Sequence, residues 1–521
     1  MSCLFEPPKL PLMKPILFLF CLLCASAPLR ETWAAAPAKP NVLFIAIDDQ
    51  NDWIGAFGGH PQAKTPNIDR LASRGVVFAD AHCAAPLCNP SRAAVFSGRH
   101  PFETGVFDNG GESIRKIAGD DALLMRHFKQ AGYRTFGTGK LLHSSSKGLF
   151  DEESYPHQRW SPFTTEQVEY TAAELPSKGT DNPRHVTMLK GREVVLPLNR
   201  MPSDRTPDEP GGDSFDWGPL DIEDDDMGDG QIAKWASEAL RAKHEQPVFV
   251  AVGFYRPHIP LFAPKKYFDL YDGVDIKLPE VKADDLDDLG PVAKALALEG
   301  TTAGEHASVV KYKQWHAAVK AYLACTSFVD AQIGRLLDAL DSGPNANNTI
   351  IVLWGDHGWH LGEKQHWGKW TGWQRSTQVP LIIAPAKSGG AVAGARCTEP
   401  VSLLDLYPTL IELCSLAPRE GLAGRSLAPL LANPEQNTGR SVLTTFGAGN
   451  YSVTGKNWHY IRYEDGSEEL YDRAADPNEW TNLAAIPEHA AQKVEMAKLL
   501  PKVSVAPGTK KKTKKSKSGD L

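Results

Sequence analysis

Three short, almost wholly apolar runs constrain the fold of this chain more than any other feature. They cover Asn41–Ile47, Pro247–Gly253 and Asn348–Trp354. An apolar run of this length, without polar alternation, is typical of a parallel strand that is buried on both faces. Between the runs, apolar residues recur at helical spacing, most clearly over Val319–Leu340. Strands that alternate with helices predict an α/β domain with a doubly wound, mostly parallel sheet.

Each run is followed by polar residues that can bind a ligand. Asp48 and Asp49 follow the first, Arg256-Pro257-His258 come soon after the second, and Asp356 and His357 follow the third. In open α/β sheets, ligands bind beyond the carboxyl ends of the strands. A single pair of adjacent acids more often caps a helix or forms ion pairs, but two such pairs after two buried strands favour a shared site.

The amino terminus has the layout of a secretory signal peptide over residues 1–36. Lys9 and Lys14 precede the apolar run Ile16–Cys24, and small residues follow as far as Ala36. The run is shorter than the about 20 apolar residues that cross a bilayer. An uncleaved anchor or an attached lipid is the alternative. We expect cleavage and an exported product without stable membrane insertion, which is periplasmic, extracellular or lysosomal depending on the host.

The rest of the chain divides into three parts. Residues 37–436 carry the alternating strands and helices, whereas residues 437–505 carry short alternating runs that predict a small antiparallel sheet with a terminal helix. Residues 506–521 form a basic tail that we expect to be disordered. Within the large part, residues 143–229 lack periodicity and predict long loops over the active rim. The net charge of -7 gives no reason to expect nucleic acid as a partner.

Cysteine usage points to one residue in particular. Five cysteines lie beyond the signal peptide, so at least one stays unpaired in an oxidising compartment. A free cysteine is most often a small buried hydrophobe. Cys88 has a different context, because it opens the motif Cys88-Asn-Pro-Ser-Arg92.

This motif, with Ser97-Gly98 downstream, resembles the signature of the type I, formylglycine-dependent sulfatase family. Phe96 stands where the family usually has Leu, and Thr65–Leu71 and Val401–Leu410 resemble further family segments. Within the family the resemblance is strongest to the iduronate-2-sulfatases, although it rests on core segments that all members share. The family fold implied is alkaline-phosphatase-like, a doubly wound sheet with a smaller C-terminal α+β domain.

The resemblance implies that Cys88 is oxidised to Cα-formylglycine. In this family a dedicated maturase performs the oxidation during export, by reading the unfolded segment. The hydrate of the aldehyde offers one hydroxyl to attack sulfur and a second to expel the sulfate, which splits a difficult hydrolysis into two easier steps. Arg92, one helical turn from residue 88, is placed to orient the hydrate and hold a sulfate oxygen.

The resemblance also implies a metal site and a set of catalytic residues. The metal ligands are the formylglycine oxygen at position 88 with Asp48, Asp49, Asp356 and His357. Mostly oxygen ligands favour Ca²⁺ or Mg²⁺, with Ca²⁺ preferred by resemblance. The segments that match the family's remaining motifs assign sulfate binding to Lys140 and Lys369, proton uptake to His143, and protonation of the departing alcohol to His258, assisted by Lys369.

Two other functions stay open at this point. A formylglycine-dependent phosphodiesterase or phosphonate hydrolase shares the same sheet and strand ends. A secreted glycan-binding protein, silent because Cys88 is never matured, is the alternative outside enzymes. The set of matching residues favours a sulfatase that acts on a sulfated saccharide.

Overall fold

The computed structural model of the chain describes residues 39–156, 161–163, 167–168, 185–203, 214–300, 304–386 and 391–506. The signal peptide predicted over residues 1–36 lies outside these ranges, as does the basic tail except for Ala506. Within the ranges, no helix is both long and apolar enough to span a bilayer.

The described residues contain an eight-stranded sheet in the order β17-β2-β16-β12-β1-β10-β4-β5. The three apolar runs are its adjacent strands β1, β10 and β12, and β1 pairs in parallel with both of the others. β16 runs antiparallel to β12 and to β2. The prediction of a doubly wound, mostly parallel sheet is therefore confirmed. The strands are β1 (Asn41–Ile47), β2 (Val76–Phe78), β4 (Arg134–Gly139), β5 (Glu152–Ser154), β10 (Val248–Phe254), β12 (Thr349–Gly355), β16 (Leu381–Ala384) and β17 (Ala395–Cys397).

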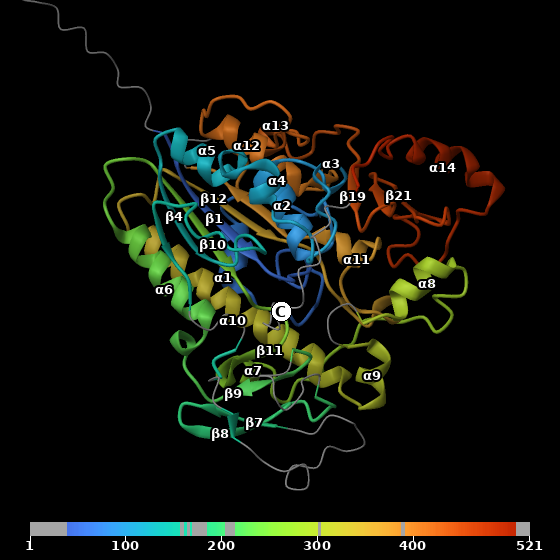
Figure 1. Cartoon of the computed structure of the whole chain (residues 1–521), viewed down its shortest axis with the longest axis horizontal. Coiled ribbons are helices and arrows are strands. Elements are labelled where there is room, and N and C mark those ends of the chain that lie inside the picture. The colour runs from blue at the N-terminus through green and yellow to red at the C-terminus, as the bar shows by residue number, and fades with distance from the viewer. Residues whose placement is uncertain are drawn as a thin grey trace, which may run out of the picture. The chain divides into compact units, whose positions relative to one another are not determined.

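Helices cover both faces of this sheet, which explains why β1 shows no polar alternation. Val42 and Phe44 pack into one hydrophobic core, and Leu43 and Ile45 pack into the other. In Figure 1 the helices α1, α6 and α10 lie on one side of the sheet and α2, α5 and α12 on the other. Their bounds are α1 (Pro66–Ala72), α2 (Cys88–Ser97), α5 (Leu124–Gln130), α6 (Gly228–Arg241), α10 (Trp315–Asp341) and α12 (Leu406–Leu413).

The C-terminal segment forms the small antiparallel sheet that the sequence predicted. Its strands are β19 (Val442–Thr445), β20 (Tyr451–Thr454), β21 (Trp458–Arg462) and β22 (Glu468–Asp472), followed by helix α14 (Ala490–Ala497). Thr445 N donates a hydrogen bond to the Ala84 carbonyl at 2.9 Å, which attaches this sheet just upstream of Cys88. The boundary at residue 437 stays a prediction.

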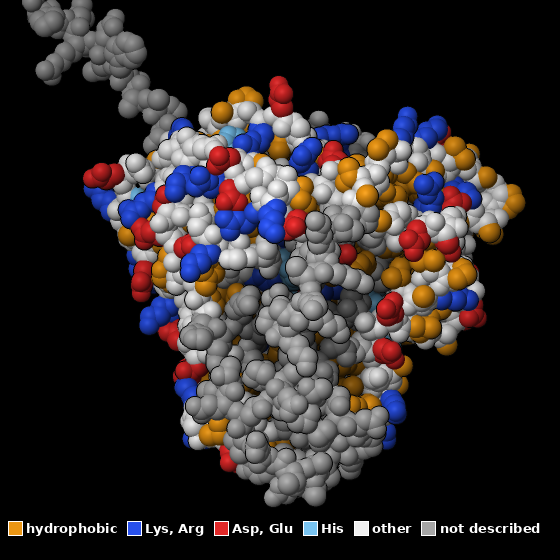
Figure 2. Space-filling view, in the orientation of Figure 1, with side chains coloured by type: hydrophobic (Ala, Val, Ile, Leu, Met, Phe, Trp, Pro, Cys, Tyr) orange, Lys and Arg blue, Asp and Glu red, His pale blue; other side chains and the backbone are white. Residues whose placement is uncertain are grey.

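Hydrophobic side chains gather around α14 in Figure 2. Among them, Val494 of α14 is 56% exposed.

The prediction of long loops over residues 143–229 is wrong for part of that segment. β7 (His185–Leu189) and β8 (Arg192–Leu196) form a hairpin, and β9 (Trp217–Leu220) pairs in parallel with β11 (Leu261–Pro264). The hairpin turn is Lys190-Gly191, and both residues have positive φ, 51° and 75°. Such turns are recognised in sequence mainly as Asn-Gly or Asp-Gly, so the Lys-Gly pair gave no signal for this hairpin.

Candidate active site

The ends of β1 and β12 bring four of the predicted residues together. Asp48 and Asp49 follow Ile47, and Asp356 and His357 follow Gly355. The Asp49 amide donates a hydrogen bond to Asp356 Oδ1 at 3.0 Å, and the Asp356 amide donates to the Ile47 carbonyl at 3.1 Å. All four side chains are fully buried. The parallel register of β1 and β12 therefore creates a dense cluster of acids at one edge of the sheet.

Cys88 is the first residue of α2 and lies beside this cluster. Its Sγ is 3.3 Å from His357 Nε2 and accepts a hydrogen bond from Lys369 Nζ at 3.1 Å. Pro90 fits the first helical turn, where its missing N–H costs no helical hydrogen bond. Ser91 Oγ donates to the Asp356 carbonyl at 2.5 Å. The N-terminal turn of α2 is thus fixed against the end of β12.

Arg92 links the two strand ends from the same face of α2. Its Nε donates to Asp356 Oδ2 at 2.8 Å, its Nη2 to Asp48 Oδ1 at 3.2 Å, and its Nη1 to the Lys140 carbonyl. Burial would raise the pKa of Asp48, but Lys140 and Arg92 hold it well below its usual range. For Asp356, burial outweighs the attraction of Arg92 and His357, so its pKa rises to about 7.

Two lysines complete the charge pattern around the sulfur. Lys369 Nζ donates to Asp49 Oδ1 at 2.6 Å, and Lys140 Nζ donates to Asp48 Oδ2 at 2.5 Å. Burial alone would raise the pKa of Cys88, but Lys140, Lys369 and His357 lower it well below its usual range. An anionic group at position 88 is therefore strongly stabilised.

A glycine makes the close approach of Lys140 feasible. Gly139 ends β4 with φ 73°, and a Cβ at this position would lie 1.9 Å from the Gly253 carbonyl oxygen. That oxygen accepts the Lys140 amide at 2.9 Å. Any larger residue at position 139 would push β4 away from β10 and move Lys140 out of the site.

Two histidines lie at the border of the cluster. His258 Nε2 is 3.8 Å from Asp49 Oδ2, and its Nδ1 is 2.5 Å from the Ile259 carbonyl. Its side chain is 13% exposed, whereas that of Asp49 is fully buried, so His258 can meet a group that arrives from solvent. His143 is near enough to Cys88 to contribute to the low pKa of its thiol. The structure thus brings all the predicted site residues together.

The acids, Cys88 and the histidines can hold a cation. Two sets have ligand atoms that lie within 4.8 Å of one another, namely Asp48, Asp49, Cys88 and His258, and Asp48, Cys88, Asp356 and His357. Within the described part of the chain, the buried Asp49 Oδ2 has no hydrogen-bond partner. His357 Nδ1 lies 3.0 Å from the Gly358 carbonyl, which leaves Nε2 as the nitrogen available to a ligand. Mostly oxygen donors fit a hard divalent cation.

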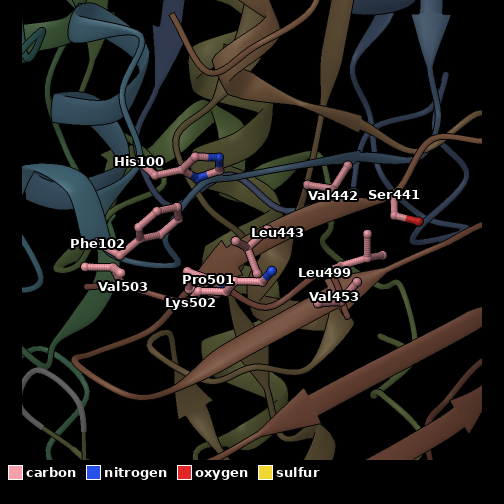
Figure 3. A pocket seen from close by; sticks show the side chains of 10 residues that line it. All are labelled: His100, Phe102, Ser441, Val442, Leu443, Val453, Leu499, Pro501, Lys502 and Val503. Carbon is pink, nitrogen blue, oxygen red and sulfur yellow. The ribbon is translucent and has the colours of Figure 1, made fainter. Parts of the chain in front are cut away.

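The cavity shown in Figure 3 lies apart from this chemistry. It has a volume of about 340 Å³ and a mainly apolar lining that includes Phe102, Leu443, Val453 and Val503. None of the site residues lines it. We therefore place the candidate active site at Cys88, where the ionisable groups converge.

One structural partner of the site escaped the sequence analysis. The Tyr322 hydroxyl on α10 donates to the Asp49 carbonyl at 2.7 Å and accepts the Asn51 amide at 2.9 Å. A tyrosine within an amphipathic helix is typical of a core position, so no sequence signal marked it. Ser91 belonged to the recognised motif, but its bond to Asp356 required the structure.

Comparison with known proteins finds matches along most of the chain. Residues 40–416 match the family described as Sulfatase, and residues 362–506 match the C-terminal family of N-sulphoglucosamine sulphohydrolase. A sulfatase from Formosa agariphila is 38% identical over 475 residues, covering 89% of this chain and 87% of the relative. Human iduronate 2-sulfatase is 29% identical over 418 residues, covering 75% of this chain and 70% of the relative.

Solved structures show the same architecture. A protein in complex with its substrate D-glucosamine-2-N,6-O-disulfate has a TM-score of 0.66 and 20% identity, covering 89% of this chain and 97% of that one. A phosphonate monoester hydrolase of Agrobacterium radiobacter has a TM-score of 0.69 and 23% identity, covering 88% and 94%. The fold is therefore alkaline-phosphatase-like. The chain belongs to the sulfatase family and is a sulfuric ester hydrolase.

Proposed function

We propose that this enzyme removes sulfate from a sulfated saccharide of the kind that iduronate-2-sulfatases use, by means of a formylglycine at position 88 and a divalent metal. The observation that carries the proposal is the position of Cys88 Sγ, which is within 3.3 Å of both Lys369 and His357 and close to three buried carboxylates. The names of the iduronate relative and of the disulfated glucosamine complex support a saccharide substrate.

The first chemical step forms a sulfated residue 88. One hydroxyl of the formylglycine hydrate releases its proton to solvent and attacks sulfur as the alkoxide, so that the new O–S bond forms while the ester O–S bond breaks. Lys140 and Lys369 neutralise the sulfate oxygens, and Arg92 keeps α2 and both strand ends in place. His258 gives a proton to the departing alcohol oxygen, which suits the partial exposure of its ring.

The second step releases sulfate. The remaining hydroxyl of residue 88 gives its proton to His143, its oxygen forms the aldehyde C=O bond, and the C–O bond to sulfate breaks. Asp48, Asp49, Asp356 and His357 would hold the metal, for which we favour Ca²⁺ with Mg²⁺ as the alternative. When bound, the metal polarises the sulfate ester and lowers the pKa of the attacking hydroxyl.

We also propose that a maturase modifies Cys88 during export through the signal peptide at residues 1–36. The burial of Cys88 supports this order of events, since its exposure in the folded chain is 0%. A modifying enzyme needs access to the thiol, so it must act before the chain folds. The folded cluster then receives the aldehyde already formed.

Replacing His258 with Ala should separate substrates by leaving group. Loss of a general acid should slow alkyl sulfates by about 100-fold or more but aryl sulfates by less than about tenfold, because a phenolate leaves without protonation. The measurement is kcat/KM for a matched pair of alkyl and aryl sulfates. Equal losses on both substrates would remove His258 from this role.

Parallel assays on aryl sulfate, aryl phosphate diester and phosphonate monoester test the proposed function. The structural likeness to a phosphonate monoester hydrolase makes that activity the second candidate. We expect the sulfate ester to be the preferred substrate, and a preference for the phosphonate would reverse the order. Turnover of any of these esters excludes a silent glycan-binding protein. Desulfation of defined sulfated oligosaccharides then identifies the sugar and the position.

A further inference from the structure

We propose that Tyr322 is a positioning residue that sets the affinity of the metal site by holding Asp49 in a strained backbone conformation. This inference rests on the proposed metal site. Asp49 has φ 57°, in the left-handed region that non-glycine residues adopt only at a cost in free energy. Such a conformation persists only when surrounding contacts enforce it.

The Tyr322 hydroxyl supplies two of those contacts at once. It donates to the Asp49 carbonyl at 2.7 Å and accepts the Asn51 amide at 2.9 Å, so it bridges the residues on either side of Gln50. One helical turn further along α10, Thr326 Oγ1 donates to Gln50 Oε1 at 3.3 Å. Helix α10 therefore holds the turn that follows β1 at three successive residues.

The turn matters because it determines where the Asp49 carboxylate points. Its Oδ1 accepts Lys369 Nζ at 2.6 Å and is 3.3 Å from His357 Nε2, whereas its buried Oδ2 lacks a hydrogen-bond partner within the described ranges. If the backbone relaxed out of the left-handed region, this carboxylate would rotate away from the other proposed ligands. Tyr322 touches no reacting group, so it acts through Asp49.

Water cannot take over the hydrogen bonds of the Tyr322 hydroxyl, because this residue is buried. Tyr322 is fully buried, and its ring packs edge-on against Trp53 with centroids 5.5 Å apart. Tyr322→Phe keeps that packing and deletes only the bridge. Removal of a residue that orients a metal ligand typically weakens metal binding by about 10- to 100-fold.

Tyr271→Phe is the matched control. Tyr271 is also buried, and its hydroxyl also bonds to α10, at Ser327 Oγ at 2.8 Å, but it contacts no residue of the site. Both variants lose one buried hydroxyl and should lose similar thermal stability. Only Tyr322→Phe should lose metal affinity.

The experiment is calorimetric titration of Ca²⁺ into the chelator-treated, matured full-length enzyme and both variants. We expect a Kd raised about 10- to 100-fold in Tyr322→Phe and unchanged in Tyr271→Phe, with kcat of Tyr322→Phe recovering at saturating Ca²⁺. An unchanged Kd in folded Tyr322→Phe overturns the inference, and so does equal weakening in both variants. If wild-type enzyme binds neither Ca²⁺ nor Mg²⁺, the metal site itself is wrong and the inference falls with it.

Thr326→Val provides the test if Tyr322→Phe does not fold. It deletes the weaker contact to Gln50 and should raise the Kd by a smaller factor. An unchanged Kd in that variant would show that α10 does not control the turn.

Discussion

Replacing Cys88 with Ala should lower turnover by about 10⁴-fold or more, because the proposed mechanism takes its covalent nucleophile from this residue. The fold should survive, since Ala fits the first turn of α2 and the main anchors of that helix are Ser91 and Arg92. The measurement is kcat on an aryl sulfate together with the melting temperature.

Cys83→Ala is the control for this prediction. Cys83 is equally buried and lies five positions upstream, but its thiol contacts the Ser376 carbonyl rather than the acid cluster. Its loss should leave kcat within a few fold of wild type. Residual activity of Cys88→Ala near the wild-type level would refute the nucleophile assignment.

Removing the metal should produce the second large effect. A chelator should abolish activity in the wild-type enzyme, and added Ca²⁺ should restore it. Asp48→Asn keeps the shape of the side chain but loses a charge that faces Arg92 and Lys140. We expect Ca²⁺ to bind to Asp48→Asn more than about 100-fold more weakly than to wild type. This exceeds the usual effect of losing a residue that only orients a metal ligand. Activity should stay lost even when Ca²⁺ is added.

A second buried acid separates metal binding from stability. Asp285 pairs with Lys364 at 2.6 Å, and both side chains are buried outside the cluster. Asp285→Asn should lower the free energy of unfolding by about as much as Asp48→Asn does, since breaking a buried ion pair typically costs about 3–5 kcal/mol. Its response to chelator and Ca²⁺ should match that of wild type. Full activity in an Asp48→Ala, Asp356→Ala double variant would contradict the metal assignment.

The central strands could be predicted from sequence because their physics is local. Alternate residues of β1 pack into different hydrophobic cores, so every residue from Val42 to Ile47 is apolar and the strand is easily recognised in the sequence. The β7–β8 hairpin could not be predicted, because Lys190 occupies a left-handed turn position in which lysine is uncommon.

The site was accessible from sequence only in part. Polar residues after buried strands indicated the rim, but Cys88 and Lys369 are 281 positions apart and only the family resemblance joined them. The role of Arg92 as a bridge between Asp48 and Asp356 depends on the register of β1 and β12. Tyr322 lay beyond prediction, because its single polar atom acts on the backbone of a residue from a distant segment.

The chemical state of residue 88 in the active enzyme can be read from one tryptic peptide. Trypsin cuts after Arg74 and Arg92 and releases a peptide that holds both Cys83 and Cys88. In enzyme secreted by a host that has a maturase, we predict an aldehyde at residue 88 and, after reduction and alkylation, a single alkyl group at Cys83. Two alkylated cysteines in a fully active preparation would contradict the formylglycine mechanism.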